Sequence, residues 1–344
     1  MTNGVDQSSA GRAVVVMNPR SGGGKVARFR LVERARAAGA QVRLTGPDQD
    51  AASLAAAAIA EGATILGAAG GDGTVSAVAA VAAEARRPLV VIPAGTRNHF
   101  ARDLGLNIRN PASALTALRA GDTALVDLGR VGSRVFVNNV SFGAYADALL
   151  TPGYREAKAR TFAEVAPGYL DGQQGVNATV DTPQGPVDVP QVVLVSNNAY
   201  HTSTLRYLGR RFALDTGQLG GIVLKRPADA PPPDALPRVR RDLRRQGRAG
   251  PPGEGIITWT AARITLHGTA AQLPAGIDGE AVLLDLPIVC EIRPRALQVL
   301  LPAQRPGIPA QRVGRPGVTP ARTADAHPGA MPGGPRRLGA HASP

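Results

Sequence analysis

TILGAAGGDGT (residues 64–74) places a short apolar run directly before a glycine-rich turn that carries one carboxylate, Asp72. The stretches AVVVMNPRSGGGK (13–25) and LVVIPAGTRNHF (89–100) repeat this order of an apolar run and a glycine-containing turn. Continuous apolar runs, in contrast to alternating ones, are typical of strands that helices cover on both faces. The three stretches therefore predict an α/β domain with a parallel sheet, in which each turn leads from a strand into a helix.

Each of these turns lies where a strand is expected to end and a helix to begin. There, backbone N–H groups without helical partners and the positive helix terminus favour an anion, and glycine lets phosphate approach the backbone closely. In open parallel sheets such turns gather at the carboxyl ends of the strands, so we expect a single nucleotide site. Its candidate residues are Ser21, Gly22, Gly23, Gly24, Lys25, Gly70, Gly71, Asp72, Gly73, Thr74, Gly95, Thr96 and Asn98.

The second half of the chain has a different pattern, and the length of 344 residues is consistent with two domains. After about residue 126, strand-like segments follow one another with few helical stretches, of which 154–166 is the clearest. This order predicts an antiparallel, β-rich, sandwich-like second domain. The expected limits are a disordered N-terminus at 1–12, an α/β domain at 13–127, a β-rich domain at 128–302 and a disordered tail rich in Pro, Gly and Arg at 303–344.

The net charge of +13 is concentrated in two Pro-rich segments, 225–248 and 303–344. Aromatic residues make up only 3% of the chain, too few to form stacking platforms for single-stranded nucleic acid, so we expect no nucleic-acid partner. The chain has a single cysteine, no apolar run of about 18 residues and no basic start followed by an apolar stretch. We therefore expect a cytoplasmic protein. The sequence does not indicate the oligomeric state.

The order and spacing of NPRSGGGK (18–25), GGDGT (70–74) and PAGTRNHFARDLGL (93–106) resemble the diacylglycerol kinase catalytic-domain family, which includes bacterial lipid kinases and sphingosine kinase relatives. The likeness continues through IDGE (277–280) and covers roughly residues 12–302. GGDGT alone also occurs in NAD kinases and phosphofructokinases, whereas the combination is specific. The resemblance implies ATP- and Mg²⁺-dependent phosphorylation of a lipid hydroxyl, such as that of diacylglycerol, in a cleft between an ATP-binding domain and a lipid-substrate domain.

The resemblance also assigns roles to single residues. It adds Asn18 and Thr45 to the nucleotide contacts and makes Glu280 the acceptor of the hydroxyl proton, with Asp278 beside it. Asp72, the third candidate catalytic residue, would face the Mg²⁺ that accompanies ATP. A carboxylate suits the role of base because a lipid hydroxyl is a poor nucleophile until its proton is removed. Judged by spacing alone, Asp-Gly-Glu favours a plain surface turn between strands, and it is the family resemblance that reverses this interpretation.

Four positions depart from the family pattern: Ser76, Ala77, His99 and Thr216. Thr216 stands where the family has the second acid of a side Mg²⁺ site, which leaves Asp215 as the candidate metal ligand there. Two alternatives to a lipid kinase therefore stay open. One is a kinase of a soluble substrate, similar to NAD kinases, and the other is a nucleotide-binding protein without turnover.

The segment PDALPRVRRDLRRQGR (233–248) would carry several arginines along one side if it is helical. A basic amphipathic helix gains about 1 kcal/mol per charge near anionic lipid. We therefore expect this segment to hold the protein peripherally on an anionic membrane surface, the inner face of the cell membrane, with a solvated charged helix as the alternative.

Overall fold

The computed structural model of the chain describes residues 12–143, 146, 174–201, 209–211, 213–225 and 255–306. The helix expected at 154–166, the basic segment 233–248 and almost all of the two expected disordered ends lie outside the described residues. Within the described ranges, no helix combines the length and the apolar character that a membrane crossing requires.

Four parallel strands form one end of the larger sheet, in the order β2-β1-β3-β4. Their bounds are β1 (Ala13–Met17), β2 (Gln41–Leu44), β3 (Ile65–Gly70) and β4 (Leu89–Pro93). Every residue of β1 and β4 is buried, because helices lie on both faces of the sheet. These strands are continuously apolar because helices cover both faces, as the sequence predicts. The parallel α/β arrangement is confirmed.

One face of this sheet packs against α3 (Ala51–Ala60) and α4 (Asp72–Glu84). The other face packs against α2 (Leu31–Ala37), η3 (Pro111–Thr116) and α6 (Ala117–Ala120). The first turn enters η2 (Ser21–Gly23) and α1 (Lys25–Arg28), and the third enters α5 (His99–Asp103). The first turn does not lead into one continuous helix, because Arg30 has a left-handed φ of 50° that separates α1 from α2.

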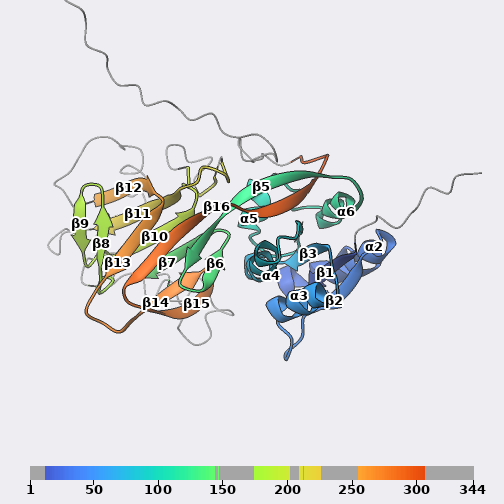
Figure 1. The fold of residues 1–344 in the computed structure, drawn as a ribbon, viewed down its shortest axis with the longest axis horizontal. Coiled ribbons are helices and arrows are strands. Elements are labelled where there is room, and N and C mark those ends of the chain that lie inside the picture. The colour runs from blue at the N-terminus through green and yellow to red at the C-terminus, as the bar shows by residue number, and fades with distance from the viewer. Residues whose placement is uncertain are drawn as a thin grey trace, which may run out of the picture.

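The larger sheet continues beyond β4 into the other half of the molecule. β16 (Ile288–Pro302) pairs in parallel with β4 and in antiparallel with β5 (Gly121–Val131). Near its beginning, β16 pairs with β13 (Arg263–His267), so one strand belongs to both halves. In Figure 1, β5 and β16 run together from one half to the other. The boundary expected at 127/128 thus falls inside β5.

The other half is β-rich and antiparallel, as the sequence predicts. A six-stranded sheet has the order β12-β11-β10-β7-β14-β15. Its strands are β7 (Asn139–Gly143), β10 (Val192–Asn197), β11 (Leu219–Lys225), β12 (Gly255–Ala261), β14 (Gln272–Ile277) and β15 (Glu280–Asp285).

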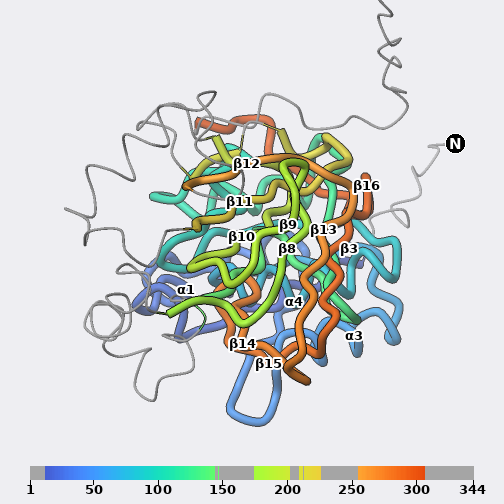
Figure 2. Tube along the Cα trace, turned by 90° about the vertical axis from the view of Figure 1, so that its left-hand side faces the viewer, coloured from blue at the N-terminus to red at the C-terminus, as the bar shows by residue number. Residues whose placement is uncertain are grey.

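The larger sheet contributes the facing layer of this half. Its strands here are β6 (Arg134–Phe136), β8 (Thr179–Thr182), β9 (Gly185–Asp188) and β13, with the first part of β16. Figure 2 views this half end-on, with β13 and β16 running alongside each other. A common apolar core, with Phe136 and Phe142 among its largest side chains, joins both sheets.

Candidate active site

The three glycine-rich turns meet at the carboxyl ends of β1, β3 and β4. A Cβ atom built on Gly22 would overlap the carbonyl oxygen of Ala94, so the first turn lies directly against the third. A Cβ atom built on Gly95 would overlap the Cα atom of Gly71, so the third turn lies directly against the second. Glycine is required at Gly22 for a second reason, its φ of 56°. The convergence that the sequence predicts is present in the fold.

Side chains from the turns hold this arrangement. Lys25 Nζ donates to Gly95 O at 2.8 Å, which ties α1 to the third turn. Asn98 closes a ring with the same residue, because its Oδ1 accepts from Gly95 N and its Nδ2 donates to Gly95 O, each at 2.8 Å. Burial, and then the charge of Arg28, lowers the pKa of Lys25. The structure therefore uses Lys25 and Asn98, both expected beside phosphate, to fix the turns.

The second turn leaves backbone donors available. Gly71 is the N-cap of α4 and supplies no side-chain acceptor to the first N–H groups of this helix. Helix N-termini of this kind bind anions through their N–H groups and their dipole. Gly70, one residue earlier, packs against the side chain of Thr74, because a Cβ atom there would lie 2.6 Å from Thr74 Oγ1.

The remaining predicted nucleotide contacts lie along the same edge. Asn18 N donates to Ala69 O at 2.8 Å, and Thr45 N donates to Met17 O at 2.9 Å, so both residues follow strand ends directly. Ser21 begins η2, and Thr96 is exposed in the third turn. Gly23 and Gly24 have open space where a side chain would stand. This edge therefore has both a backbone cradle and accessible surface.

Asp72 connects the turns to the second half of the molecule. Its Oδ1 accepts from Phe100 N at 3.3 Å and from Asn138 Nδ2 at 3.2 Å. Asn138 lies between β6 and β7, and its own Oδ1 accepts from Arg211 Nη2 at 2.9 Å. The amide of Asn138 is thus fixed from both sides and holds the Asp72 carboxylate in one orientation.

Arg211 is completely buried in this network. Its Nε donates to Asp103 Oδ2 at 2.7 Å, and its Nη1 donates to Val137 O at 2.6 Å and to Asn197 O at 2.9 Å. Burial alone would lower the pKa of this guanidinium, but the charge and hydrogen bond of Asp103, with the charges of Tyr200 and Asp278, together outweigh burial and raise it. A permanent positive charge therefore lies behind Asn138 and Asp72.

Glu280, the first residue of β15, reaches the second turn from the β-rich half. Its Oε1 lies 2.5 Å from the position that a Cβ atom on Gly73 would occupy. The residue is exposed, so the carboxylate is open to solvent and to a substrate. A side chain at position 73 would displace this carboxylate from its place beside the turn. The structure therefore brings Glu280 to the turn that carries Asp72.

Asp278, two residues earlier, has different surroundings. Its Oδ1 accepts from Asn138 N at 2.8 Å and from Asn139 N at 3.0 Å, and its Oδ2 accepts from Val137 N at 2.8 Å. Burial raises the pKa of Asp278 to about 6, although these N–H donors and the Ser76 hydroxyl oppose the shift. Asp278 therefore fixes the β6–β7 connection, and Glu280 is the member of the pair that faces the turn.

The region of the expected side metal site is occupied by protein contacts. Asn198 Nδ2 donates to Thr216 Oγ1 and to Asp127 Oδ2, each at 2.8 Å, and Asp127 Oδ2 also accepts from Gly217 N at 2.7 Å. In the described part of the chain, no group of three or more His, Cys, Asp and Glu side chains is arranged to hold a metal ion. The metal role of Asp215 stays a prediction.

His99 lies close to Asp72 at the start of α5. Burial lowers the pKa of His99, and the charge of Asp72 opposes this shift only in part. The imidazole is therefore neutral near pH 7, and it does not compensate for the negative charge of Asp72.

The sequence analysis missed the residues that support the site: Asp103, Asp127, Asn138 and Arg211. A signal for one of them was present, since Asp127 interrupts an apolar stretch of β5. Buried acids are rare unless a partner satisfies them. No local signal marks Arg211 as the partner of Asp103, because the two are 108 positions apart.

Comparison with known proteins agrees with this geometry. The model of the diacylglycerol kinase catalytic domain matches residues 12–131. A Pseudomonas fluorescens protein named "Probable lipid kinase YegS-like" is 46% identical over 116 residues, which are 33% of this chain and 38% of that protein. A Mycobacterium tuberculosis protein named "Diacylglycerol kinase" is 39% identical over 125 residues, which are 35% of this chain and 40% of that protein. The chain thus matches about two fifths of the length of these relatives.

A solved structure is similar over a longer range. The crystal structure of a diacylglycerol kinase from Bacillus anthracis superposes with a TM-score of 0.59 and 20% sequence identity, covering 84% of this chain and 96% of that chain. At this identity the likeness shows the fold, including the β-rich half. Together with the family match over the three turns, it agrees with the resemblance read from the sequence: residues 12–131 are similar to the diacylglycerol kinase catalytic domain.

Proposed function

We propose that the protein is an ATP-dependent lipid kinase that transfers the γ-phosphoryl group of ATP to a hydroxyl of diacylglycerol or a related lipid. The observation that carries the proposal is the position of Glu280 from β15 directly beside Gly73 of the glycine-rich second turn. A carboxylate that is exposed and next to an anion-binding turn can accept a proton from an incoming hydroxyl. The names of the relatives support a lipid as the acceptor.

The residues of the three turns fit a nucleoside triphosphate. The mutual contacts of Gly22, Gly95 and Gly71 leave backbone N–H groups without side chains in front of them, and Gly71 leaves the start of α4 uncapped. Asp72, which Asn138 holds, is the carboxylate that would face an ATP-bound Mg²⁺. ATP with Mg²⁺ would supply the phosphoryl group and part of the charge neutralisation on it.

The chain's own groups would then perform three tasks. The turns bind and orient the phosphates, the buried charge of Arg211 fixes Asn138 and through it Asp72, and Glu280 accepts the hydroxyl proton. Positioning and electrostatics of this kind account for most of the catalysis in phosphoryl transfer. Asp278 contributes by fixing the backbone on which Asn138 lies.

A lipid acceptor requires access to a bilayer, and we propose that the basic segment 233–248 provides it at the cytoplasmic face of the membrane. The support for this part is the arginine pattern in the sequence. Sedimentation with vesicles tests it, since replacement of Arg241, Arg244, Arg245 and Arg248 by glutamine should abolish binding that depends on anionic lipid. Unchanged sedimentation would leave a solvated charged segment.

The kinase proposal is tested with γ-³²P-labelled ATP and a total lipid extract. We expect labelled product in the chloroform phase and its loss when the lipid is omitted. Label in a water-phase product would indicate a kinase of a soluble substrate. Nucleotide binding without any labelled product would indicate a binding protein without turnover.

A further inference from the structure

A cavity lies at the C-terminal end of α4, away from the three turns. It has a volume of about 570 Å³ and lies between the C-terminal end of α4, β5 and the irregular part of β16. The pairing of β16 with β5 shifts register between Arg293 and Leu297, which opens this space. At about 1.5 Å per residue, the stretch of α4 from Asp72 to Ala82, the first lining residue, separates the cavity from Asp72 by about 15 Å. None of its lining residues belongs to the candidate active site.

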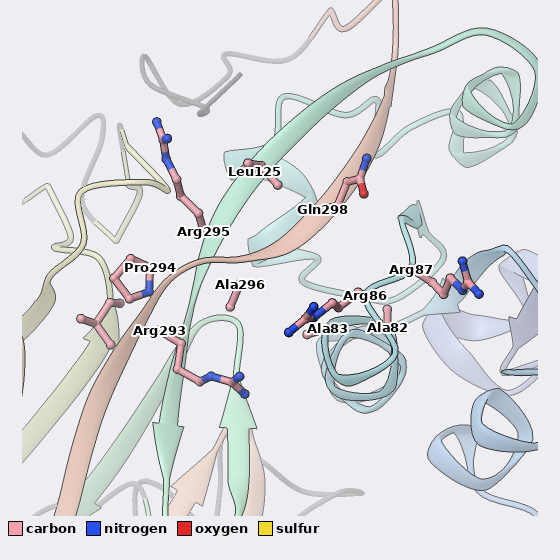
Figure 3. Close-up of a pocket in the computed structure, with 11 residues that line it drawn as sticks. Ala82, Ala83, Arg86, Arg87, Leu125, Arg293, Pro294, Arg295, Ala296 and Gln298 are labelled. Atoms are coloured by element: carbon pink, nitrogen blue, oxygen red, sulfur yellow. The ribbon is translucent and has the colours of Figure 1, made fainter. Parts of the chain in front are cut away.

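The lining of this cavity is basic and contains no acid. Its arginines are Arg86, Arg87, Arg293 and Arg295, and its floor includes Ala82, Ala83, Leu125 and Ala296. In Figure 3 the side chains of Arg86 and Arg293 extend from α4 and β16 toward the space between these elements, whereas Arg87 and Arg295 point outward. In the part of the chain that the structure describes, neither Arg86 nor Arg293 forms an ion pair or a side-chain hydrogen bond, whereas exposed arginines elsewhere, such as Arg130 and Arg263, do.

We propose that this cavity, defined by Arg86 and Arg293, is a binding site for a phosphomonoester dianion that is separate from the nucleotide site. The guanidinium groups of Arg86 and Arg293, both directed toward one cavity, repel each other unless an anion lies between them. The planar fork of arginine matches the oxygens of a phosphate in bidentate fashion. The volume accommodates a phosphate with a small organic group attached, and the alanines and the leucine offer that group an apolar surface.

One effect opposes the proposal. The C-terminal end of α4 carries roughly half a negative charge, which disfavours an anion. Two full positive charges from Arg86 and Arg293 exceed it, and both side chains are exposed enough to turn toward a ligand. The balance therefore favours binding of a dianion more than binding of a single carboxylate.

The test uses glycerol 3-phosphate and isothermal titration of the full chain at about 0.15 M salt, where non-specific attraction is screened. The pocket variant is Arg86→Gln/Arg293→Gln. The matched control, Arg34→Gln/Arg36→Gln, removes the same charge from the exposed surface of α2. We expect the pocket variant to lose at least about tenfold in affinity, since the contact of one guanidinium with phosphate corresponds to about a factor of ten or more, and we expect the control to match the wild type.

A second variant, Arg86→Lys/Arg293→Lys, keeps the charge and removes the fork, and we expect it to bind more weakly than the wild type and more tightly than the glutamine variant. Any phosphate that binds at the three turns contributes equally in all four proteins. Equal titrations for the pocket variant and the control would overturn the proposal.

Sedimentation with phosphatidylcholine vesicles, with and without phosphatidic acid, then distinguishes two sources of the same headgroup. If only the pocket variant loses sedimentation that depends on phosphatidic acid, the natural source is a lipid. If sedimentation is unchanged while the titration is weakened, the source is a free phosphomonoester. Both results support the site and assign its ligand.

Discussion

Arg211 Nε lies 2.7 Å from Asp103 Oδ2, and this ion pair is almost completely buried between the two halves of the molecule. Burial of two charges is expensive, and the remaining donors of Arg211 reduce the cost because they reach two backbone carbonyls and Asn138. The pair therefore connects α5 of the α/β half with the β-rich half and, through Asn138, with Asp72.

Removal of one partner should be strongly destabilising. We expect Arg211→Met to lower the free energy of unfolding by about 3 kcal/mol, the lower end of the range for a broken buried pair, because the buried Asp103 carboxylate then keeps only Arg210, whose Nε lies 3.6 Å from Asp103 Oδ1. Urea titration followed by circular dichroism measures this loss. The double variant Asp103→Leu/Arg211→Met should lose less than the sum of the two single losses.

A surface pair provides the control for this experiment. Arg263 and Glu291 also form an ion pair, but the Arg263 side chain is 66% exposed. Arg263→Met should leave the urea midpoint nearly unchanged, since solvent screens exposed pairs. Similar losses for Arg211→Met and Arg263→Met would contradict the role assigned to the buried pair.

Alanine substitutions at two glycines of the first turn distinguish the stability cost of backbone strain from the cost of a steric overlap. Gly22 and Gly24 have φ values of 56° and 76°, so alanine is strained at both positions, at a cost of about 1–2 kcal/mol. A Cβ atom at Gly22 would in addition overlap Ala94 O, whereas at Gly24 it meets open space. We expect Gly22→Ala to cost about 1–3 kcal/mol more than Gly24→Ala, because the first and third turns must move apart.

Thermal unfolding of both variants, with and without ATP, measures this difference. Gly22→Ala should also lose the stabilisation by ATP, whereas Gly24→Ala should keep part of it. If the two variants have the same midpoint and the same response to ATP, the turns are not in the contact described here.

The parts of the fold that depend on local pattern could be predicted from the sequence. The buried parallel strands follow from continuous apolar runs, and the turns follow from glycines at the ends of β1, β3 and β4. The position of β16 could not be predicted in this way. Its pairing with both β4 and β13 joins segments that are far apart in the chain, and a strand's own composition does not determine its neighbours.

The candidate site also contains residues that local patterns predict and residues that they do not predict. Glycine and acid motifs predict the turns and Glu280, because each motif is contiguous in the sequence. The network of Arg211, Asn138 and Asp103 is assembled from three distant segments by tertiary packing, so no spacing rule finds it. Lys25 and Asn98 show the converse, since residue types that suit phosphate are used here for hydrogen bonds between turns.

Asp278 should lower the free energy of unfolding as the pH rises, which is the opposite of the usual effect of a carboxylate. Its pKa is raised from 3.8 to about 6, so the folded state binds the proton more tightly than the unfolded state does. The contribution of Asp278 to stability is therefore largest below about pH 4, falls as the pH rises to about 6, and amounts to a loss of about 3 kcal/mol above that range.

The measurement compares the wild type with Asp278→Asn in urea at several pH values between about 4 and 7. Other carboxylates contribute equally to both proteins, so the difference in unfolding free energy isolates Asp278. Asparagine keeps one acceptor oxygen and has an NH₂ group in place of the other, so at least one of the three N–H groups loses its acceptor, which shifts the whole curve of the variant downward. We expect the advantage of the wild type to shrink as the pH rises. An advantage that grows with pH would mean that the pKa of Asp278 is lowered and not raised.

Glu280→Gln separates catalysis from nucleotide binding. Glutamine preserves the shape of the side chain beside Gly73 but cannot accept a proton, so we expect kcat to fall about 10²–10⁴-fold with little change in the affinity for ATP. Labelled-lipid turnover and equilibrium binding of ATP measure the two quantities.

The matched control is Asp285→Asn at the other end of β15, where the carboxylate accepts from Gln272 Nε2 on the neighbouring strand, and it should retain activity. Glu280→Asp should keep a small part of the rate, because the shorter side chain moves the base away from the turn. If Glu280→Gln turns over at the wild-type rate, the base is a different group, and the contact between β15 and the second turn serves only to pack the two halves together.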